Sequence, residues 1–260
     1  LQGGHFEFRF GLDTDVYEIN GPHFKAKKVE TQGSTFLYEG MTNEGKTLYE
    51  KVFYHLNGKE LDLSSKNGFF LLSRDLSTGE SLNLEIFALV GESLEELSLP
   101  LKLDYEAQKK AHVNVFSSLF RSSNVALQGE EDVNLETAYA IYSLLILGDS
   151  SHDRSIPARG VSGQTYKGAI FWDSEIFLLP FFALTNPSVA RSLLKYRIAT
   201  LSGAKKKARQ FGYSGAFYAW ESQDTGEEAC SLYNVTDYKT GKPIRTYFNE
   251  KQIHISADIP

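Results

Sequence analysis

The segment His5-Phe6-Glu7-Phe8-Arg9-Phe10-Gly11-Leu12 shows the pattern that decides the first part of the fold. Its four large apolar side chains, at positions 6, 8, 10 and 12, fall on one face of an extended chain, while Glu7 and Arg9 point to the other. This period of two is typical of a strand with one buried face. The alternation returns weakly in Thr47–Leu56 and clearly at Leu82, Leu84, Ile86 and Ala88.

Turn-forming residues separate these alternating segments along the first 97 residues. They occur at Asn20-Gly21-Pro22, Asn43-Glu44-Gly45, Asn57-Gly58, Asn67-Gly68 and Thr78-Gly79. Asn and Gly tolerate the left-handed backbone that tight turns require. Short strands divided by such turns predict an antiparallel β-sandwich, or part of one, over residues 1–97.

Near Leu97 the hydrophobic period changes to that of a helix. Two segments, Asp104–Phe120 and Asn134–Leu147, place apolar side chains three and four residues apart, which predicts amphipathic helices. A third segment, Ser174–Leu184, is apolar nearly all round, so we expect a buried helix that Pro180 kinks or ends. The chain therefore passes from a β region to an α region, with residues 92–103 as the join.

The best-marked helix begins at Asn186, which suits an N-cap, and Pro187, which suits the first helical position. Apolar residues recur through Leu201, and Gly212 follows a basic last turn. Two interpretations of that turn stay open, a phosphate site or a set of charges that complements the helix dipole, and the second is the simpler. The basic residues are Lys205, Lys206, Lys207 and Arg209.

The composition excludes several classes of protein. The 260 residues are 42% hydrophobic and 13% aromatic, which suits a substantial core and excludes a disordered chain. With 27 basic and 33 acidic side chains, the formal charge of −6 offers no basic surface for nucleic acid or an anionic membrane. The apolar runs are too short to span a bilayer. Because Cys230 is the single cysteine and no Cys or His cluster completes a metal site, we expect a cytoplasmic protein without metal or cofactor.

Both tryptophans of the chain are followed at once by a carboxylate, in Trp172-Asp173 and in Trp220-Glu221. A flat apolar ring beside hydrogen-bond acceptors is what a sugar ring requires, because it presents C–H groups to stack and hydroxyls to bind. Glycine-rich polar loops precede both pairs, and loops often carry binding residues. The alternative, in which each Trp belongs to the core and each acid is solvated or caps a helix, stays open.

Two further groups near the end of the chain are candidates for chemistry. Glu227 and Glu228 would form a paired acid site if they faced each other, or a solvated loop if they point apart. His254 is either buried and hydrogen-bonded or part of a polar pocket. The loop glycines form no phosphate cradle, because no Gly-Lys-Ser/Thr sequence follows them.

Taken together, these residues resemble glycoside hydrolase family 65, which contains disaccharide phosphorylases acting on maltose, trehalose, kojibiose, nigerose and related α-glucosides. The matching pieces occur in family order along nearly the whole chain. They are Asp15–His23, Ala158-Arg159-Gly160, Tyr166-Lys167-Gly168, Phe171–Phe177, Trp220-Glu221-Ser222, Thr225–Glu228 and His254–Ile259. Departures at Thr165, Ala169 and Ala219 put the acceptor sugar in doubt more than the glucose pocket.

The resemblance implies an α+β multidomain fold. Residues 1–97 would be part of the N-terminal antiparallel β-sandwich, residues 98–130 a helical linker, and residues 131–260 the first part of an (α/α)6 barrel. The resemblance also implies that loops of this barrel bind the transferred glucosyl ring. The substrate-binding residues carried over are Trp172, Asp173, Trp220 and Glu221, with His254 nearby.

The activity implied is inverting phosphorolysis of an α-glucosyl disaccharide to β-glucose 1-phosphate, with inorganic phosphate as co-substrate. No catalytic residue is assigned, because the general acid and phosphate-binding loops of the family are expected downstream of His254–Ile259. We therefore expect this chain to be the middle of a longer protein, which the missing parts or a second copy would complete. Two alternatives stay open, a trehalase-like hydrolase of the same architecture and a non-catalytic sugar-binding fragment.

Overall fold

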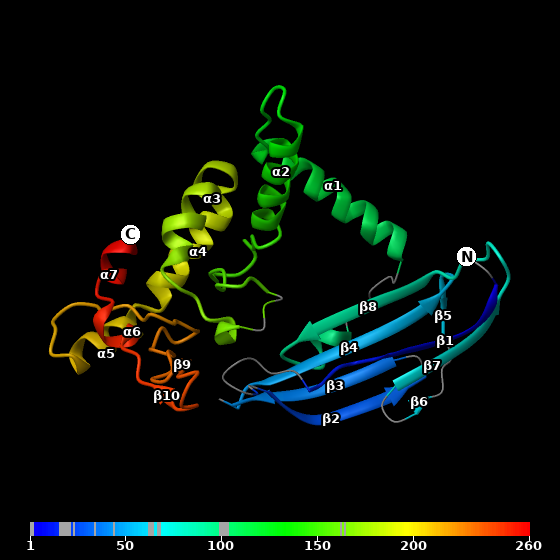
Figure 1. Ribbon diagram of the computed structural model, residues 1–260, viewed down its shortest axis with the longest axis horizontal. Coiled ribbons are helices and arrows are strands. Elements are labelled where there is room, and N and C mark those ends of the chain that lie inside the picture. Colours follow the sequence, from blue (N-terminus) through cyan, green and yellow to red (C-terminus); the bar gives the residue numbers. More distant parts are fainter. Residues whose placement is uncertain are drawn as a thin grey trace. The chain divides into compact units, whose positions relative to one another are not determined.

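The computed structural model describes residues 3–15, 22, 24–33, 35–43, 45–61, 65, 66, 69–98, 104–161, 163 and 165–260. The chain forms two compact units, Leu1–His112 and Val113–Pro260 (Figure 1). The domain boundaries expected at residues 97 and 130 stay a prediction. Most of the Asp15–His23 piece, namely residues 16–21 and 23, lies outside the described residues.

The first unit contains two antiparallel sheets. The smaller sheet has the order β1-β7-β6 and the larger sheet β2-β3-β4-β5, with β8 also paired to β4. The predicted strand at residues 5–12 is confirmed as β1, and Thr47–Leu56 is β4. The bounds are β1 Gly4–Gly11, β2 Phe24–Gln32, β3 Thr35–Thr42, β4 Thr47–Leu56, β5 Lys59–Glu60, β6 Ser65–Lys66, β7 Phe69–Leu76 and β8 Leu84–Gly91.

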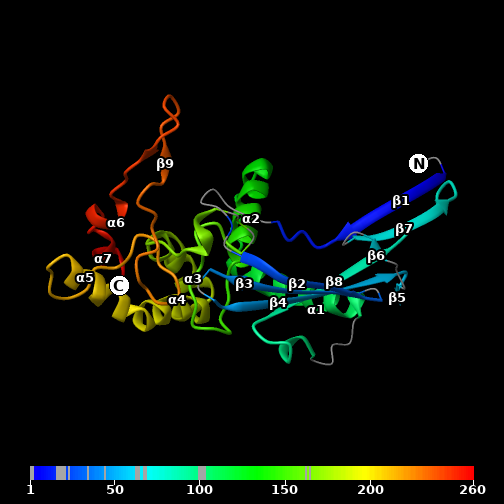
Figure 2. The same cartoon turned by 90° about the horizontal axis from the view of Figure 1, so that it is seen from below.

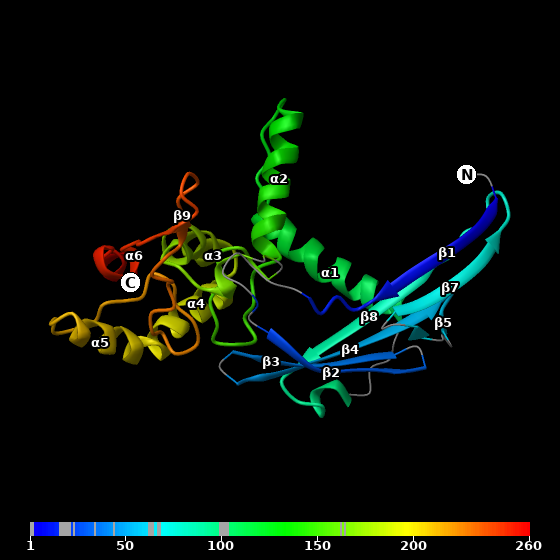
Figure 3. The same cartoon turned by 60° about the horizontal axis from the view of Figure 1, so that its bottom comes forward.

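One hydrophobic core joins the two sheets, whose layers can be followed in Figure 3. Phe36 of β3 and Tyr54 of β4 pack against Phe70 of β7, with ring centroids 4.3 Å and 5.7 Å from that of Phe70. From β1, Phe8 and Phe10 pack onto this cluster. The alternation that opened the sequence therefore places its apolar face on the core, as predicted.

The turn between β4 and β5 is the tight turn that its sequence predicts. Asn57 and Gly58 have φ values of 51° and 74°. Two consecutive positive φ angles are typical of the type I′ turn that connects antiparallel strands, and Asn and Gly adopt them with little strain.

Strand β8 departs from the expectation of a half-buried strand. The register places Ile86 opposite Tyr54 and Ala88 opposite Val52, so the predicted apolar face lies on the core side of the sheet. Ile86 is nevertheless 54% exposed. The reason is that the core side chains of the smaller sheet pack against β3 and β4. Within the described residues, they do not cover the face of β8.

The second unit is mainly helical, and helix α1 (Tyr105–Ser123) runs across the boundary between the units. Both predicted amphipathic helices are confirmed, as α1 and as α2 (Glu131–Leu145), and Phe116 contacts Tyr142 with ring centroids 5.8 Å apart. The other elements are a short 3-10 helix in the first unit, η1 (Glu96–Ser98), and then η2 (Tyr166–Gly168), η3 (Ser174–Leu178), α3 (Leu179–Thr185), α4 (Pro187–Ala199), α5 (Leu201–Gln210), β9 (Val235–Thr236), β10 (Pro243–Ile244), α6 (Phe248–Lys251) and α7 (Ile255–Asp258).

Two expectations about these helices are wrong in part. The segment 174–184 is π-helical up to Leu178 and α-helical from Leu179, beside Pro180. It is buried on one side only, because the core cluster around Phe182 and Leu193 covers that side while Leu184 is 88% exposed. The helix expected from residue 187 onward is interrupted at Thr200 and divides into α4 and α5.

Antiparallel sheets followed by helices make the chain an α+β protein. The (α/α)6 barrel and its linker stay predictions. None of the described helices combines the length and the hydropathy needed to cross a bilayer. The antiparallel β9–β10 hairpin extends away from the helices of its own unit (Figure 2).

Candidate functional site

An antiparallel bridge brings the two Trp-acid pairs together. The backbone N–H of Ile170 donates to the carbonyl of Ser222 at 2.8 Å, and the N–H of Ser222 donates to the carbonyl of Ile170 at 2.9 Å. The bridge is isolated and does not continue as a ladder, because Trp172 already lies in a turn. It nevertheless joins the backbones of two segments that are far apart in the sequence, one leading into Trp172-Asp173 and the other following Trp220-Glu221.

Trp172, Asp173 and His254 form the more accessible side of this site. Trp172 is half-buried, and its neighbour Asp173 is exposed. The ring of His254 meets the Trp172 indole edge to face, with centroids 5.1 Å apart. Nδ1 of His254 lies 2.6 Å from a carboxylate oxygen of Asp258, one turn along α7. Asp258 therefore fixes the orientation of the imidazole beside the indole.

Trp220 is half-buried between two aromatic neighbours. Phe248 stacks on it with ring centroids 5.3 Å apart and an interplanar angle of 18°, and Phe171 meets it edge to face at 5.7 Å. One face of this indole therefore packs against protein. The expectation that Trp220 contacts a sugar stays a prediction and would require the opposite face or the ring edge.

Glu221 is a buried carboxylate, only 4% exposed. One of its oxygens pairs with the ammonium group of Lys167 at 2.9 Å. Burial raises the pKa of Glu221, whereas the hydrogen bond and charge of Lys167 lower it and the negative charge of Glu228 raises it. Its expected role in binding glucose hydroxyls also stays a prediction.

The adjacent acids Glu227 and Glu228 do not form a paired acid site. Glu227 is exposed and pairs with Lys206 at 2.7 Å. Glu228 turns inward, where its carboxylate accepts the backbone N–H groups of Trp220 at 2.9 Å and Glu221 at 3.0 Å. The loop carrying the second Trp-acid pair is thus held at its backbone by a carboxylate eight residues further on.

The basic end of α5 serves to hold loops. Lys207 is almost fully buried and pairs with Glu228 at 2.6 Å. It also donates to the carbonyl of Tyr218 at 3.3 Å and lies 3.9 Å from the centroid of the Phe217 ring. The charge of Lys207 is therefore satisfied by a carboxylate, which disfavours the alternative of a phosphate site at this residue.

A second buried ion pair supports the first Trp-acid pair. Arg197 of α4 binds both carboxylate oxygens of Glu175, at 2.9 and 2.8 Å, and also donates to the carbonyl of Phe171 at 2.8 Å. Both side chains are shielded from solvent. Arg197 has no distinguishing pattern in the sequence, because α4 also carries Arg191 and Lys195. Its position among apolar neighbours was the available signal.

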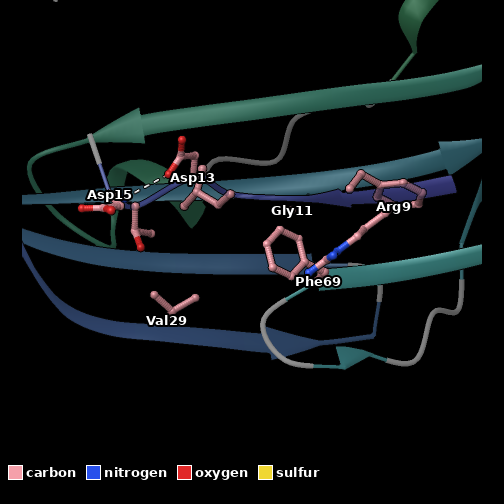
Figure 4. Close-up of a pocket in the computed structure, with 9 residues that line it drawn as sticks. Arg9, Gly11, Asp13, Asp15, Val29 and Phe69 are labelled. Carbon is pink, nitrogen blue, oxygen red and sulfur yellow. Dashed lines mark hydrogen bonds between the residues drawn. The ribbon is translucent and has the colours of Figure 1, made fainter. Parts of the chain in front are cut away.

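A separate hollow lies on the first unit, between β1 and its neighbours (Figure 4). The guanidinium group of Arg9 lies 3.9 Å from the centroid of the Phe69 ring, so it covers one face of that ring. Asp13 and Asp15 line the hollow as well. Among the described residues, no group of three or more His, Cys, Asp or Glu side chains is arranged to hold a metal ion.

The chain is similar to several known proteins. Residues 138–260 match the family model for the central catalytic domain of glycosyl hydrolase family 65. The chain is 38% identical over 293 residues to a nigerose phosphorylase from Lachnoclostridium phytofermentans, covering 96% of this chain and 38% of that protein. It is 28% identical to a kojibiose hydrolase from Flavobacterium johnsoniae, covering 78% of this chain and 30% of that protein.

A solved structure shares the fold. It is described as a candidate kojibiose phosphorylase from the human microbiome, and it matches 88% of this chain and 33% of its own with a TM-score of 0.70 at 20% identity. The chain thus spans about a third of the length of these relatives. Residues 138–260 are therefore part of a glycosyl hydrolase family 65 catalytic domain, and a phosphorylase aligns along nearly the whole chain.

Proposed function

We propose that the protein is an inverting phosphorylase that cleaves an α-glucosyl disaccharide with inorganic phosphate and releases β-glucose 1-phosphate. The observation that supports the proposal is the Ile170–Ser222 bridge, because it joins the segments that carry the two Trp-acid motifs in a part of the chain that matches a glycosidase-family catalytic domain. The phosphorylase among the relatives favours phosphate as the second substrate.

In this reaction, a carboxylic acid protonates the glycosidic oxygen while a phosphate oxygen attacks C1 from the opposite face of the ring. The C1–O bond to the leaving sugar breaks, the C1–O bond to phosphate forms, and the configuration at C1 is inverted. Phosphate is already anionic, so a single acid suffices where an inverting hydrolase needs a second carboxylate to activate water. No residue of this chain is assigned as that acid, which we expect in a later segment of the family catalytic domain.

The described residues would hold the glucosyl ring. The exposed carboxylate of Asp173 would accept hydrogen bonds from hydroxyl groups of the sugar, and the half-buried indole of Trp172 would stack on the C–H face of the sugar ring. His254, oriented by Asp258, would present its second ring nitrogen to another hydroxyl. Hydrogen bonds to these hydroxyls contribute to catalysis when they strengthen as the ring flattens toward an oxocarbenium ion.

Substitution of Asp173 tests the proposal. In the protein expressed from its complete reading frame, Asp173→Ala should lower kcat/KM for phosphorolysis by well over tenfold, since losing a charged hydrogen-bond partner costs about 2–4 kcal/mol. Asp153→Ala is a suitable control, because Asp153 is exposed and pairs only with the exposed Lys195 among its described contacts. Near-wild-type phosphorolysis in the Asp173 variant would remove Asp173 from the site.

Hydrolysis is the second candidate, because a kojibiose hydrolase is among the relatives. Phosphate dependence separates the two activities. A phosphorylase should release glucose 1-phosphate only when phosphate is present, at a rate that saturates with phosphate. Release of free glucose at the same rate with and without phosphate would establish the hydrolase.

A further inference from the structure

We propose that Lys167 is a positioning residue of the Trp-acid site, whose ammonium group holds the Glu221 carboxylate in place and in its ionised form. The proposal rests on the proposed function, because it takes Glu221 as a sugar-binding residue, the role that the family resemblance predicts for it. Three observations carry it: the backbone that presents Lys167, the contacts of its ammonium group, and the charges around Glu221.

The backbone at Lys167 adopts a conformation that side chains usually avoid. Tyr166, Lys167 and Gly168 have φ values of 68°, 57° and 69°, so three consecutive residues are left-handed and two of them carry a Cβ. Each non-glycine residue in this conformation costs about 1–2 kcal/mol. A hydrogen bond from the N–H of Ala169 to the carbonyl of Tyr166, 2.7 Å long, closes the turn. Contacts made by the side chains must offset the remaining strain.

The ammonium group of Lys167 makes those contacts with a distant segment. It donates to the carbonyl of Ala229 at 2.8 Å, lies 3.5 Å from the hydroxyl of Ser231, and pairs with Glu221 at 2.9 Å. The side chains of the Lys167–Glu221 pair are only 12% and 5% exposed. Two hydrogen bonds and one ion pair thus engage the ammonium group within the chain. Lys167 therefore acts through Glu221 rather than as a ligand of phosphate.

The charges around Glu221 explain why its ionised form depends on Lys167. Burial and the negative charge of Glu228 both raise the pKa of Glu221, and the hydrogen bond with Cys230 and the contacts with Lys167 lower it. Lys167 supplies the positive charge among these groups, since Lys207 is engaged with Glu228. Without Lys167, burial and a like charge would act on Glu221 with only the Cys230 hydrogen bond opposing them.

The pH profile of the variant Lys167→Met tests this role. In the protein from the complete reading frame, wild type must first show phosphate-dependent cleavage; if it does not, the proposed function fails. Given activity, the acid side of the kcat/KM profile should move upward by about one pH unit or more in Lys167→Met, a tenfold loss at acid pH with a much smaller loss near pH 8. Phosphate titrates identically in every assay, so the difference between the variants gives the result.

Two matched variants accompany this measurement. Lys167→Arg keeps the charge and should restore the position of the acid limb. Lys206→Met removes a lysine from the exposed pair with Glu227 and should leave the profile unchanged. An equal loss at all pH values in Lys167→Met would show a merely structural role, and an unchanged profile would show no role; either result overturns the proposal.

A fluorescence measurement, which needs no turnover, tests the role of Lys167 separately from the proposed phosphorylase activity. Because Trp220 precedes Glu221, its fluorescence should respond to protonation of that carboxylate, with a midpoint that Lys167→Met moves to higher pH and with no response in Trp220→Phe. If Lys167→Met does not fold, the double variant Lys167→Met/Glu221→Gln decides. If the double variant folds and its fluorescence no longer responds to pH, the proposal is supported, because both members of the Lys167–Glu221 pair are then neutral. If the double variant does not fold, Lys167 is needed for its contact with Ala229, and the proposal is overturned.

Discussion

At the scale of single residues, the buried ion pair of Arg197 and Glu175 shows how burial determines the stability cost of a substitution in the second unit. The two side chains are 2% and 0% exposed, and their fork-shaped contact also fixes the Phe171 carbonyl next to Trp172. A buried pair adds little net stability over an apolar pair of similar size. Removing one member, however, leaves the other as an uncompensated charge in a poorly solvated place. The consequence of a single substitution therefore greatly exceeds the net value of the pair.

We accordingly expect Arg197→Met to lower the free energy of unfolding of the second unit by about 3–5 kcal/mol. Lys195→Met, two residues earlier on the same helix, removes an exposed pair with Asp153 and should cost less than about 1 kcal/mol. Urea unfolding followed by tryptophan fluorescence measures both, since Trp172 and Trp220 lie in this unit. Equal costs for the two variants would contradict the assignment of a buried, paired charge to Arg197.

Cys230 illustrates how burial controls a reactive group. Its thiol is 8% exposed, accepts a hydrogen bond from the Asn234 amide at 3.2 Å, and has a pKa raised to about 11, chiefly by burial. A thiolate is the nucleophile in alkylation. At pH 8, the lower thiolate fraction alone should slow labelling by iodoacetamide about two-hundredfold relative to an ordinary thiol. The same protein in urea is the control, and rapid labelling of the folded form would refute the raised pKa.

Sequence reasoning identified the candidate site residues by type but missed those that hold them. Trp172-Asp173 and Trp220-Glu221 could be selected because an indole beside an acid is rare and occurs twice. Lys167 and Arg197 could not, since their contacts join residues 62 and 22 positions apart, and no local period encodes such a separation. Glu228 was noticed for its neighbour Glu227, although its contacts are with the backbone of the Trp220 loop.

At the scale of elements, local pattern predicted where helices and strands begin better than where they are interrupted. The start of α4 at Pro187 is as predicted, because proline fits the first turn. The interruption at Thr200 was missed. The hydroxyl of Thr200 donates at 2.8 Å to the Tyr196 carbonyl, which also accepts the backbone N–H of Thr200, and the loop at Gly226 packs against the same turn. This packing is tertiary and leaves no periodic signal.

Glycine at position 203 makes that close approach possible. A Cβ on Gly203 would lie 2.4 Å from the carbonyl carbon of Gly226 and 2.6 Å from the carbonyl oxygen of Thr225, both backbone atoms. Helix propensity alone favours Gly203→Ala by about 1 kcal/mol. The collision forces α5 and the loop apart, so we expect a net destabilisation of about 1–3 kcal/mol.

Thermal unfolding measures the sign of this effect. Ser202→Ala, at an exposed position of the same helix, should change Tm little or raise it slightly. A higher Tm in Gly203→Ala would mean that the loop can move away at little cost, and the close contact would then play no part in holding the Trp220 loop.

At the scale of the whole molecule, each unit has a hydrophobic core of its own. The first core is built from both sheets around Phe36, Tyr54 and Phe70, and the second from α3 and α4 around Phe182 and Leu193. Alternating patterns predicted the first core well, because strand period and turn residues agree there. The patterns overestimated burial in β8 and in the segment 174–184. Apolar side chains are present there, but no described element packs over all of them.

Separate cores predict separate responses to core substitutions. Phe70→Ala should cost about 3–5 kcal/mol in the first unit, and Leu193→Ala about 2–5 kcal/mol in the second, because each side chain is almost fully buried and leaves a cavity. Hydrogen exchange read out on peptides from each unit distinguishes local from global loss of stability. We expect Phe70→Ala to accelerate exchange in β3, β4 and β7 while α3 and α4 keep wild-type protection, and Leu193→Ala to do the reverse. Loss of protection throughout the chain in both variants would mean that the two cores unfold as one cooperative body.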